Sequence, residues 1–170
     1  EKLAGSDTIV LQRKVGRKFI TEFIGDRSSL SVVKNDLQGP QNLQELSLIE
    51  YERRRVEMGE PIFGHELTED FNPLEAGLLD HISFNKGCYI GQEVVARLDT
   101  YDKVQRKLVR LSWDGLLEED VIISEGKVVG VITSQLEGIG LGFVRNDYAR
   151  EGSDLENLKA WRIQCKVERF

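Results

Sequence analysis

The first part of the chain alternates apolar and polar residues in two short runs. Residues 8–11 and 18–24 read as strands on either side of a turn at Gly16, with apolar alternation around Phe19 and Phe23. Residues 43–58 have nearly helical apolar spacing, and Gly59 predicts the end of that helix. The segment between the second strand and this helix reads as a polar stretch that contains Gly39-Pro40. Asn72 as a cap predicts a second, short helix over residues 73–79.

The pattern changes after residue 104. Residues 107–112, 121–123, 127–133, 138–144 and 161–167 are short strand-like runs, and Glu125-Gly126 predicts a hairpin turn. Short, regularly spaced strands are typical of a small barrel. The glycines of this region are interpreted as turn and bulge residues rather than a phosphate cradle; they are Gly126, Gly130, Gly138, Gly140 and Gly142.

These elements predict an α+β chain in two parts. Residues 1–102 would be a truncated α/β domain, and residues 103–170 a small antiparallel β-barrel, with a boundary near Asp102. The first part has too few strands to form a complete sheet by itself, so it would leave a strand edge with unpaired backbone groups. Missing upstream strands would account for this. The chain does not begin with Met, so we expect a fragment or a processed product.

Composition narrows the class of protein. A hydrophobic content of 40% in 170 residues suffices for a packed core. Apolar runs stay well short of the roughly 20 residues that span a membrane, and no signal peptide is apparent. We therefore expect a soluble protein of the cytoplasm or an organelle matrix, without a membrane partner. A net charge of -6 argues against a general grip on nucleic acid, although Arg53-Arg54-Arg55 could be a solvated surface or a local anion contact.

Most familiar catalytic patterns do not occur in the sequence. His65 and His81 lack partners at metal-ligand spacing, so no metal site is predicted. Serine elbows and dinucleotide or P-loop glycine patterns are also missing. Cys88 and Cys165 lie far apart in the sequence, and both are expected to be reduced.

The densest cluster of reactive and glycine residues surrounds one of these cysteines. Cys88 lies in the run Lys86-Gly87-Cys88-Tyr89-Ile90-Gly91-Gln92-Glu93. Lys86 would lower the pKa of the Cys88 thiol, and so would a helix opening at the end of the run. The same run also fits a tight turn into a helix, in which Cys88 is a small buried apolar residue. Both interpretations stay open at this point.

Four segments, read in order, resemble a known family. They are Arg55-Val56-Glu57-Met58-Gly59, Phe63-Gly64-His65-Glu66-Leu67, Asn72-Pro73-Leu74-Glu75-Ala76-Gly77-Leu78 and the Cys88 run. This order is similar to the folate-binding YgfZ-type family, which is related to the glycine cleavage T-protein, an aminomethyltransferase. The segment from Gly126 to Gly142 is similar to that family's C-terminal barrel hairpin. The Cys88 run is the specific part, since the T-protein lacks it.

The resemblance implies a fold and a function. It implies an aminomethyltransferase-like folate-binding domain, here truncated, before the barrel, so that the chain looks like a C-terminal half. It also implies tetrahydrofolate as cofactor and a role with iron–sulfur client or assembly proteins. Cys88 and Lys86 would carry the chemistry. The residues expected to contact folate or a partner are Tyr51, Arg55, Glu57, Gly87, Tyr89, Gly91, Gln92 and Glu93, of which the last two could instead cap a helix.

Two departures weaken the aminomethyltransferase alternative. Tyr51 stands where the T-protein has its folate-clamping arginine, and Lys18 and Phe19 stand near the place of its acidic residue. Folate-dependent aminomethyl transfer is thus one alternative to a cysteine-based role. A noncatalytic protein-interaction module, in which Cys88 only packs, is another.

Overall fold

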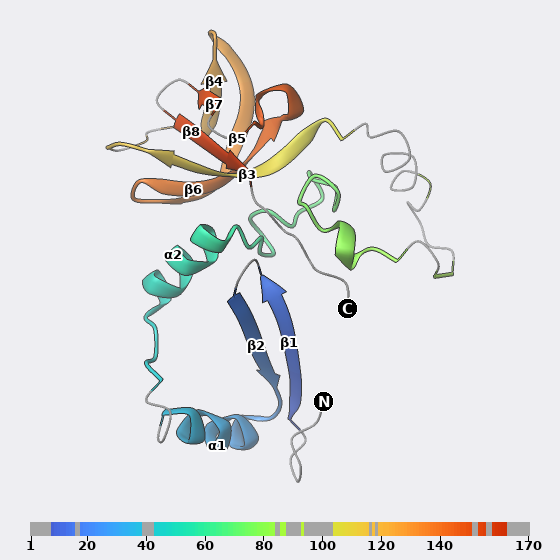
Figure 1. Ribbon diagram of the computed structural model, residues 1–170, viewed down its shortest axis with the longest axis vertical. Helices are drawn as coiled ribbons and strands as arrows, with labels where there is room; N and C mark the ends of the chain where they lie inside the picture. Colours follow the sequence, from blue (N-terminus) through green and yellow to red (C-terminus); the bar gives the residue numbers. More distant parts are fainter. Residues whose placement is uncertain are drawn as a thin grey trace. The chain divides into compact units, whose positions relative to one another are not determined.

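The computed structural model describes residues 8–15, 18–38, 43–83, 86–87, 93, 104–115, 117, 119–150, 153–155 and 158–162. The chain divides into two compact units (Figure 1). Unit 1 comprises Glu1–Tyr51 with Cys165–Phe170, and unit 2 comprises Glu52–Gln164. The boundary predicted near Asp102 falls on a residue outside the described ranges and stays a prediction.

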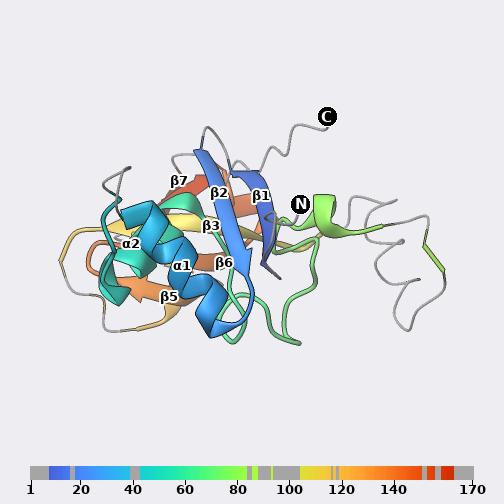
Figure 2. The ribbon, with the colours of Figure 1, turned by 90° about the horizontal axis from the view of Figure 1, so that it is seen from below.

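Unit 1 contains the predicted hairpin and a helix that the pattern did not predict. Strands β1 (Ile9–Val15) and β2 (Lys18–Ile24) pair antiparallel, as expected, with Ile9 opposite Ile24. The segment read only as polar, with no element assigned, contains α1 (Arg27–Gln38), which lies beside the hairpin (Figure 2). Asp26 caps this helix by accepting the Ser29 N–H at 2.9 Å. Apolar residues of α1 line a groove with Phe23 of β2; they are Leu30, Val33 and Leu37.

Helix α2 (Leu48–Met58) begins later than predicted. Ser47 and Glu50 form a reciprocal cap: the Ser47 N–H donates to Glu50 Oε2 at 2.8 Å, and the Glu50 N–H donates to Ser47 Oγ at 3.3 Å. This cap fixes the start five residues after Leu43. The predicted end is confirmed, since Gly59 has φ +72° and its N–H donates to the Val56 carbonyl.

Unit 2 is built on a six-stranded antiparallel sheet. The strands are β3 (Arg106–Trp113), β4 (Val121–Ser124), β5 (Lys127–Leu136), β6 (Ile139–Arg145), β7 (Ser153–Leu155) and β8 (Leu158–Arg162). Their order is β4-β5-β6-β3-β8-β7. No ladder joins β7 to β4 among these described strands, so the expected barrel is an open sheet here.

The connections confirm one turn and correct one helix. Glu125 and Gly126 have φ of +53° and +69°, as a two-residue hairpin turn requires. The helix predicted over residues 73–79 is wrong: residues 73–77 form turns, followed by the short 3₁₀ helix η1 (Leu79–His81). Asn72 still caps this segment, because its Oδ1 accepts the Leu74 and Glu75 N–H groups at 2.9 Å. A second 3₁₀ helix, η2 (Asn146–Tyr148), follows β6.

The final strand also differs from the prediction. The expected strand over residues 161–167 appears as β8, three residues earlier, and the residues after Arg162 lie outside the described ranges. The three-residue strand β7, which pairs with β8, was not predicted. A helix long and apolar enough to cross a membrane does not occur in the described ranges.

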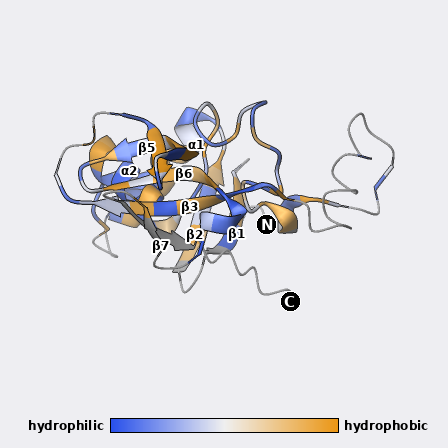
Figure 3. Ribbon diagram, turned by 90° about the horizontal axis from the view of Figure 1, so that it is seen from above, coloured by the Kyte–Doolittle hydropathy of each residue, from blue (hydrophilic) through white to orange (hydrophobic). Residues whose placement is uncertain are grey.

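Both faces of the sheet bury apolar side chains, and hydrophobic residues recur along β5 and β6 in the ribbon of Figure 3. One face gathers Val109, Leu111, Trp113, Ile122, Val129, Ile132 and Val144. The other packs Leu108, Leu141 and Phe143 against Val56 of α2 and Ala76 of the following segment. The segment between α2 and η1 is therefore part of the core of unit 2. Gly140 leaves room on the opposite face of the sheet, because a Cβ there would lie 2.5 Å from the Ser134 carbonyl oxygen and 2.8 Å from the Trp113 ring.

Candidate functional site

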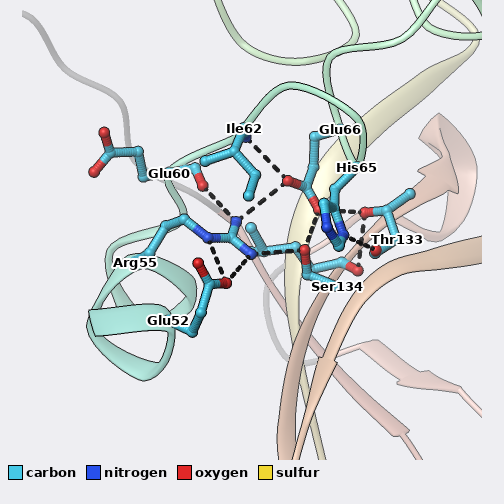
Figure 4. A network of polar contacts seen from close by, with 9 residues as sticks. Glu52, Arg55, Glu60, Ile62, His65, Glu66, Thr133 and Ser134 are labelled. Carbon is cyan, nitrogen blue, oxygen red and sulfur yellow. Dashed lines mark hydrogen bonds and ion pairs between the residues drawn. The ribbon is translucent and has the colours of Figure 1, made fainter. Parts of the chain in front are cut away.

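Among the described residues of unit 2, a dense polar cluster surrounds the guanidinium of Arg55, which is 1% exposed (Figure 4). Its Nε and Nη2 donate to Glu52 Oε2 at 3.0 and 2.8 Å. Nη1 donates to the Glu60 carbonyl at 2.8 Å and to Glu66 Oε2 at 3.2 Å. Nη2 also donates to Ser134 Oγ at 2.8 Å. These bonds use all five N–H groups of an arginine.

The carboxylate of Glu66 forms the other half of this buried pair, with no exposed surface. Its Oε1 accepts the hydroxyls of Thr133 and Ser134, each at 2.6 Å. Its Oε2 accepts the Ile62 N–H and the Arg55 guanidinium, both at 3.2 Å. A buried carboxylate is costly unless its lone pairs are satisfied, and here four donors satisfy them.

A β-bulge explains how two consecutive hydroxyls reach one carboxylate. Side chains of neighbouring strand residues normally point to opposite faces of a sheet. In β5 the pairing with β6 passes from Ile132 to Ser134, so Thr133 is the extra residue. Such a bulge redirects side chains and frees a backbone group. The freed Thr133 carbonyl lies 3.0 Å from His65 Nδ1. We call the segment from Ile62 to Leu67, which docks on this bulge, the Phe63 turn.

A second set of contacts fixes the next part of the chain on the same sheet. Arg106 of β3 binds the buried Glu75 with two hydrogen bonds, from Nε to Oε1 at 3.0 Å and from Nη2 to Oε2 at 3.2 Å. Its guanidinium lies 4.9 Å from the centre of the Phe71 ring, and Phe71 stacks on Phe143. The Arg106–Glu75 ion pair and the Phe71–Phe143 stack together hold residues 71–75 against β3 and β6.

The structure describes only some of the predicted site residues, so the predicted site stays a prediction. Lys86, Gly87 and Glu93 are exposed, whereas Cys88, Tyr89, Gly91 and Gln92 lie outside the described ranges. Tyr51 is half exposed and belongs to unit 1. Glu57 is exposed, and its carbonyl accepts the Arg110 guanidinium at 2.6 Å. A ligand contact through the Arg55 side chain would have to displace one of its present bonds.

Sequence reasoning missed the partners of Arg55. Glu66 appeared only as part of a motif, and Glu52, Thr133 and Ser134 were not singled out. Their signal was weak, because a Thr-Ser pair in an apolar strand gives no direction for its side chains until the bulge is known. The arrangement holds α2, the Phe63 turn and β5 in one register. Within the described residues, no group of three or more potential metal ligands gathers.

Parts of this chain are similar in sequence to known proteins. Residues 105–169 match the family described as CAF17, C-terminal beta-barrel domain. A chloroplastic protein of Arabidopsis thaliana, named as a candidate transferase, is 40% identical over 62% of this chain and 26% of its own length. An aminomethyltransferase of Halothermothrix orenii is 34% identical over 59% of this chain and 30% of its own. One from Desulfitobacterium hafniense is 32% identical over 71% and 35%.

These matches define a C-terminal β-barrel-type domain in proteins similar to aminomethyltransferases. They confirm the predicted resemblance: the chain is similar to the C-terminal part of the YgfZ/CAF17-type folate-binding family. It spans only 26% to 35% of the length of these three relatives.

Proposed function

We propose that this chain is part of a folate-dependent protein of the YgfZ type. Its Cys88 thiol would act in the assembly or repair of iron–sulfur enzymes. The observation that supports the proposal is the continuity of the motif segments with the C-terminal sheet. Residues 55–78 are packed and hydrogen bonded against that sheet, and the chain then leads to the exposed Lys86 and Gly87, immediately before Cys88.

The proposed chemistry follows from the residues next to the thiol. The ammonium group of Lys86 favours the thiolate, which is the reactive form of cysteine. Gly87 and Gly91 allow a loop that exposes the thiol, while Tyr89 offers a flat face to a ligand or partner. Tetrahydrofolate is the proposed cofactor and iron–sulfur proteins are the proposed partners. The location, in the cytoplasm or an organelle matrix, remains a prediction.

Alkylation kinetics of Cys88 test the chemical part of this proposal. In a Cys165→Ser background, the alkylation rate of the folded chain is measured against pH and compared with that of the denatured chain. We expect the native profile to turn over well below the free-thiol pKa of about 8.5. Lys86→Met should move this transition upward, whereas the control Lys127→Met, at an exposed lysine of β5, should leave it unchanged. A thiol that alkylates only after unfolding would contradict a reactive Cys88.

A cellular assay tests the biological part. In cells that lack the protein, the full-length form with Cys88→Ala should fail to restore the activity of an iron–sulfur enzyme that the unaltered form restores. Normal restoration by this variant would show that the thiol is dispensable and favour a scaffold role.

Aminomethyl transfer to tetrahydrofolate is the second candidate. The observation in its favour is that several relatives are named aminomethyltransferases, one of them 32% identical over 71% of this chain. Tyr51 at the place of the clamping arginine weighs against it. A transfer assay on the full-length protein separates the candidates, because transfer that persists in Cys88→Ala would support the transferase.

A further inference from the structure

Phe63 is the most exposed large hydrophobic side chain in the described ranges, at 89%. It lies in unit 2, which has a well-packed core, so its exposure does not reflect a poorly formed region. Exposed aromatic rings are frequent anchors for flat ligands and for partners. The function proposed from the Cys88 run does not use Phe63.

The backbone that carries Phe63 is fixed before any ligand binds. The Glu66 and Leu67 N–H groups donate to the Ile62 carbonyl at 3.2 and 3.0 Å, and the Gly64 N–H donates to the Leu67 carbonyl at 3.3 Å. Beneath the turn, Glu66 binds both hydroxyls of the bulge. The entropy cost of ordering this loop is thus met during folding, which favours binding.

His65 adds a directed polar group to the same turn. A carbonyl oxygen only accepts hydrogen bonds, so the contact between His65 Nδ1 and the Thr133 carbonyl requires a proton on Nδ1. In the neutral ring, Nε2 is then the acceptor. The His65 side chain is exposed. Phe63 and His65 are two residues apart, so their Cα atoms are separated by at most about 7.6 Å.

Gly64, between these two residues in the sequence, has open space where a side chain would stand. It has φ +85°, and a Cβ built on it would meet no atom within 4 Å. A flat molecule could therefore approach both the phenyl face and the imidazole without meeting a side chain at position 64. The turn offers an apolar ring, an open position at Gly64 and a hydrogen-bond acceptor.

We propose that the Phe63 turn is a binding platform for a flat heteroaromatic ring that carries N–H donors. Phe63 would stack on the ring, and His65 Nε2 would accept one of its N–H groups. A protein partner explains the turn less well, because a pocket on its surface could bind the phenyl ring without a hydrogen bond to His65 Nε2. A nucleic acid is also a poor source of the stacked ring, because its phosphates would be repelled by a chain with a net charge of -6. The inference rests on the proposed folate-dependent function, in which the ring is the pterin of tetrahydrofolate.

Calorimetric titration of the full-length protein with 5-formyltetrahydrofolate, a stable tetrahydrofolate, tests this platform. Since stacking on an aromatic side chain contributes about 1–3 kcal/mol, Phe63→Ala should weaken binding by about tenfold or more. Phe63→Trp should restore most of the affinity. The matched control is Val128→Ala, because Val128 is 62% exposed in the same unit and lies outside the turn. Titration should also shift the His65 Nε2 resonance in ¹⁵N NMR spectra.

The outcomes separate this inference from the proposed function. Binding by the unaltered chain that Phe63→Ala leaves unchanged would overturn the platform while folate dependence stands. Binding lost in Phe63→Ala and not recovered in Phe63→Trp, with no shift at His65, would also overturn it. If the unaltered full-length protein binds no folate, the proposed function itself fails. Loss in Phe63→Ala, recovery in Phe63→Trp and an unchanged Val128→Ala affinity would support the platform.

Discussion

At the scale of single residues, the Arg55–Glu66 pair matters more for register than for net stability. Burying two charges costs several kcal/mol, and their attraction offsets this cost only when every polar atom finds a partner. Here each N–H of Arg55 and both oxygens of Glu66 are hydrogen bonded. Sliding the Phe63 turn along β5 would leave charged atoms without partners. We infer that the pair selects one alignment of α2, turn and strand.

Replacing Glu66 with glutamine should therefore destabilise unit 2, although the side chain keeps its size. The amide oxygen can still accept the two hydroxyls, but the amide NH₂ would then face the donors Arg55 and Ile62 N–H. Breaking a buried pair by changing one partner typically costs about 3–5 kcal/mol. Urea unfolding followed by tryptophan fluorescence measures this loss. Glu57→Gln, on the exposed side of α2, is the control and should change stability little. Equal midpoints for the two variants would contradict a structural role for Glu66.

At the scale of elements, α1 shows how a local cap creates a helix that apolar spacing alone left undetected. Asp26 accepts hydrogen bonds from the Ser28 hydroxyl, the Ser29 N–H and the Ser29 hydroxyl. The Ser28 hydroxyl, followed by the Ser29 backbone and side-chain donors, holds the pKa of the Asp26 carboxyl well below its usual range. The folded state thus binds a proton at Asp26 less readily than the unfolded chain does.

This depressed pKa predicts how α1 responds to acid. The Asp26 cap stabilises α1 fully at pH values above about 3.9, the pKa of an aspartate in the unfolded chain. This stabilisation is lost as the pH falls from there toward the lower pKa of Asp26 in the folded state. We expect Asp26→Ala to increase amide exchange of α1 several-fold at pH 7. Acidification below pH 4 should bring the unaltered chain toward the variant. Hydrogen exchange resolved by mass spectrometry measures both, with Asp36→Ala, inside the helix, as the control. Equal α1 exchange in Asp26→Ala and Asp36→Ala would contradict the cap.

The elements also show what the sequence could and could not predict. The hairpin of β1 and β2, the end of α2 and the turn at Glu125 followed local signals, and the structure confirms them. The start of α2 was placed too early, because Ser47 caps the helix together with Glu50 of its first turn, so that the helix begins only at Leu48. The Thr133 bulge depends on pairing with β6, which no local pattern specifies. The contacts of the Thr133 and Ser134 hydroxyls with Glu66 and Arg55 depend on that bulge, so this part of the site could not be predicted.

At the scale of the whole molecule, the two units differ in how much apolar surface they bury. In the described part of unit 1, Thr8 is the only buried residue. Large apolar side chains are exposed along each of its elements, among them Leu11, Phe19, Val32 and Ile49. Unit 2 instead buries apolar residues on both faces of its sheet. A two-stranded hairpin is marginally stable by itself, so unit 1 taken alone should open far more easily than unit 2.

Native-state hydrogen exchange of the 170-residue chain should reveal this difference. Because local opening free energies range from near zero up to the global value, we expect β1 and β2 amides to exchange at least about 100-fold faster than those of β3, β5 and β6. Exchange is measured at several protein concentrations, since self-association would protect unit 1 in a concentration-dependent way. Equal protection of both units at low concentration would contradict the prediction, because the apolar side chains of unit 1 would then have to be covered within the monomer. Fast exchange that slows as the concentration rises would show that a second copy covers them.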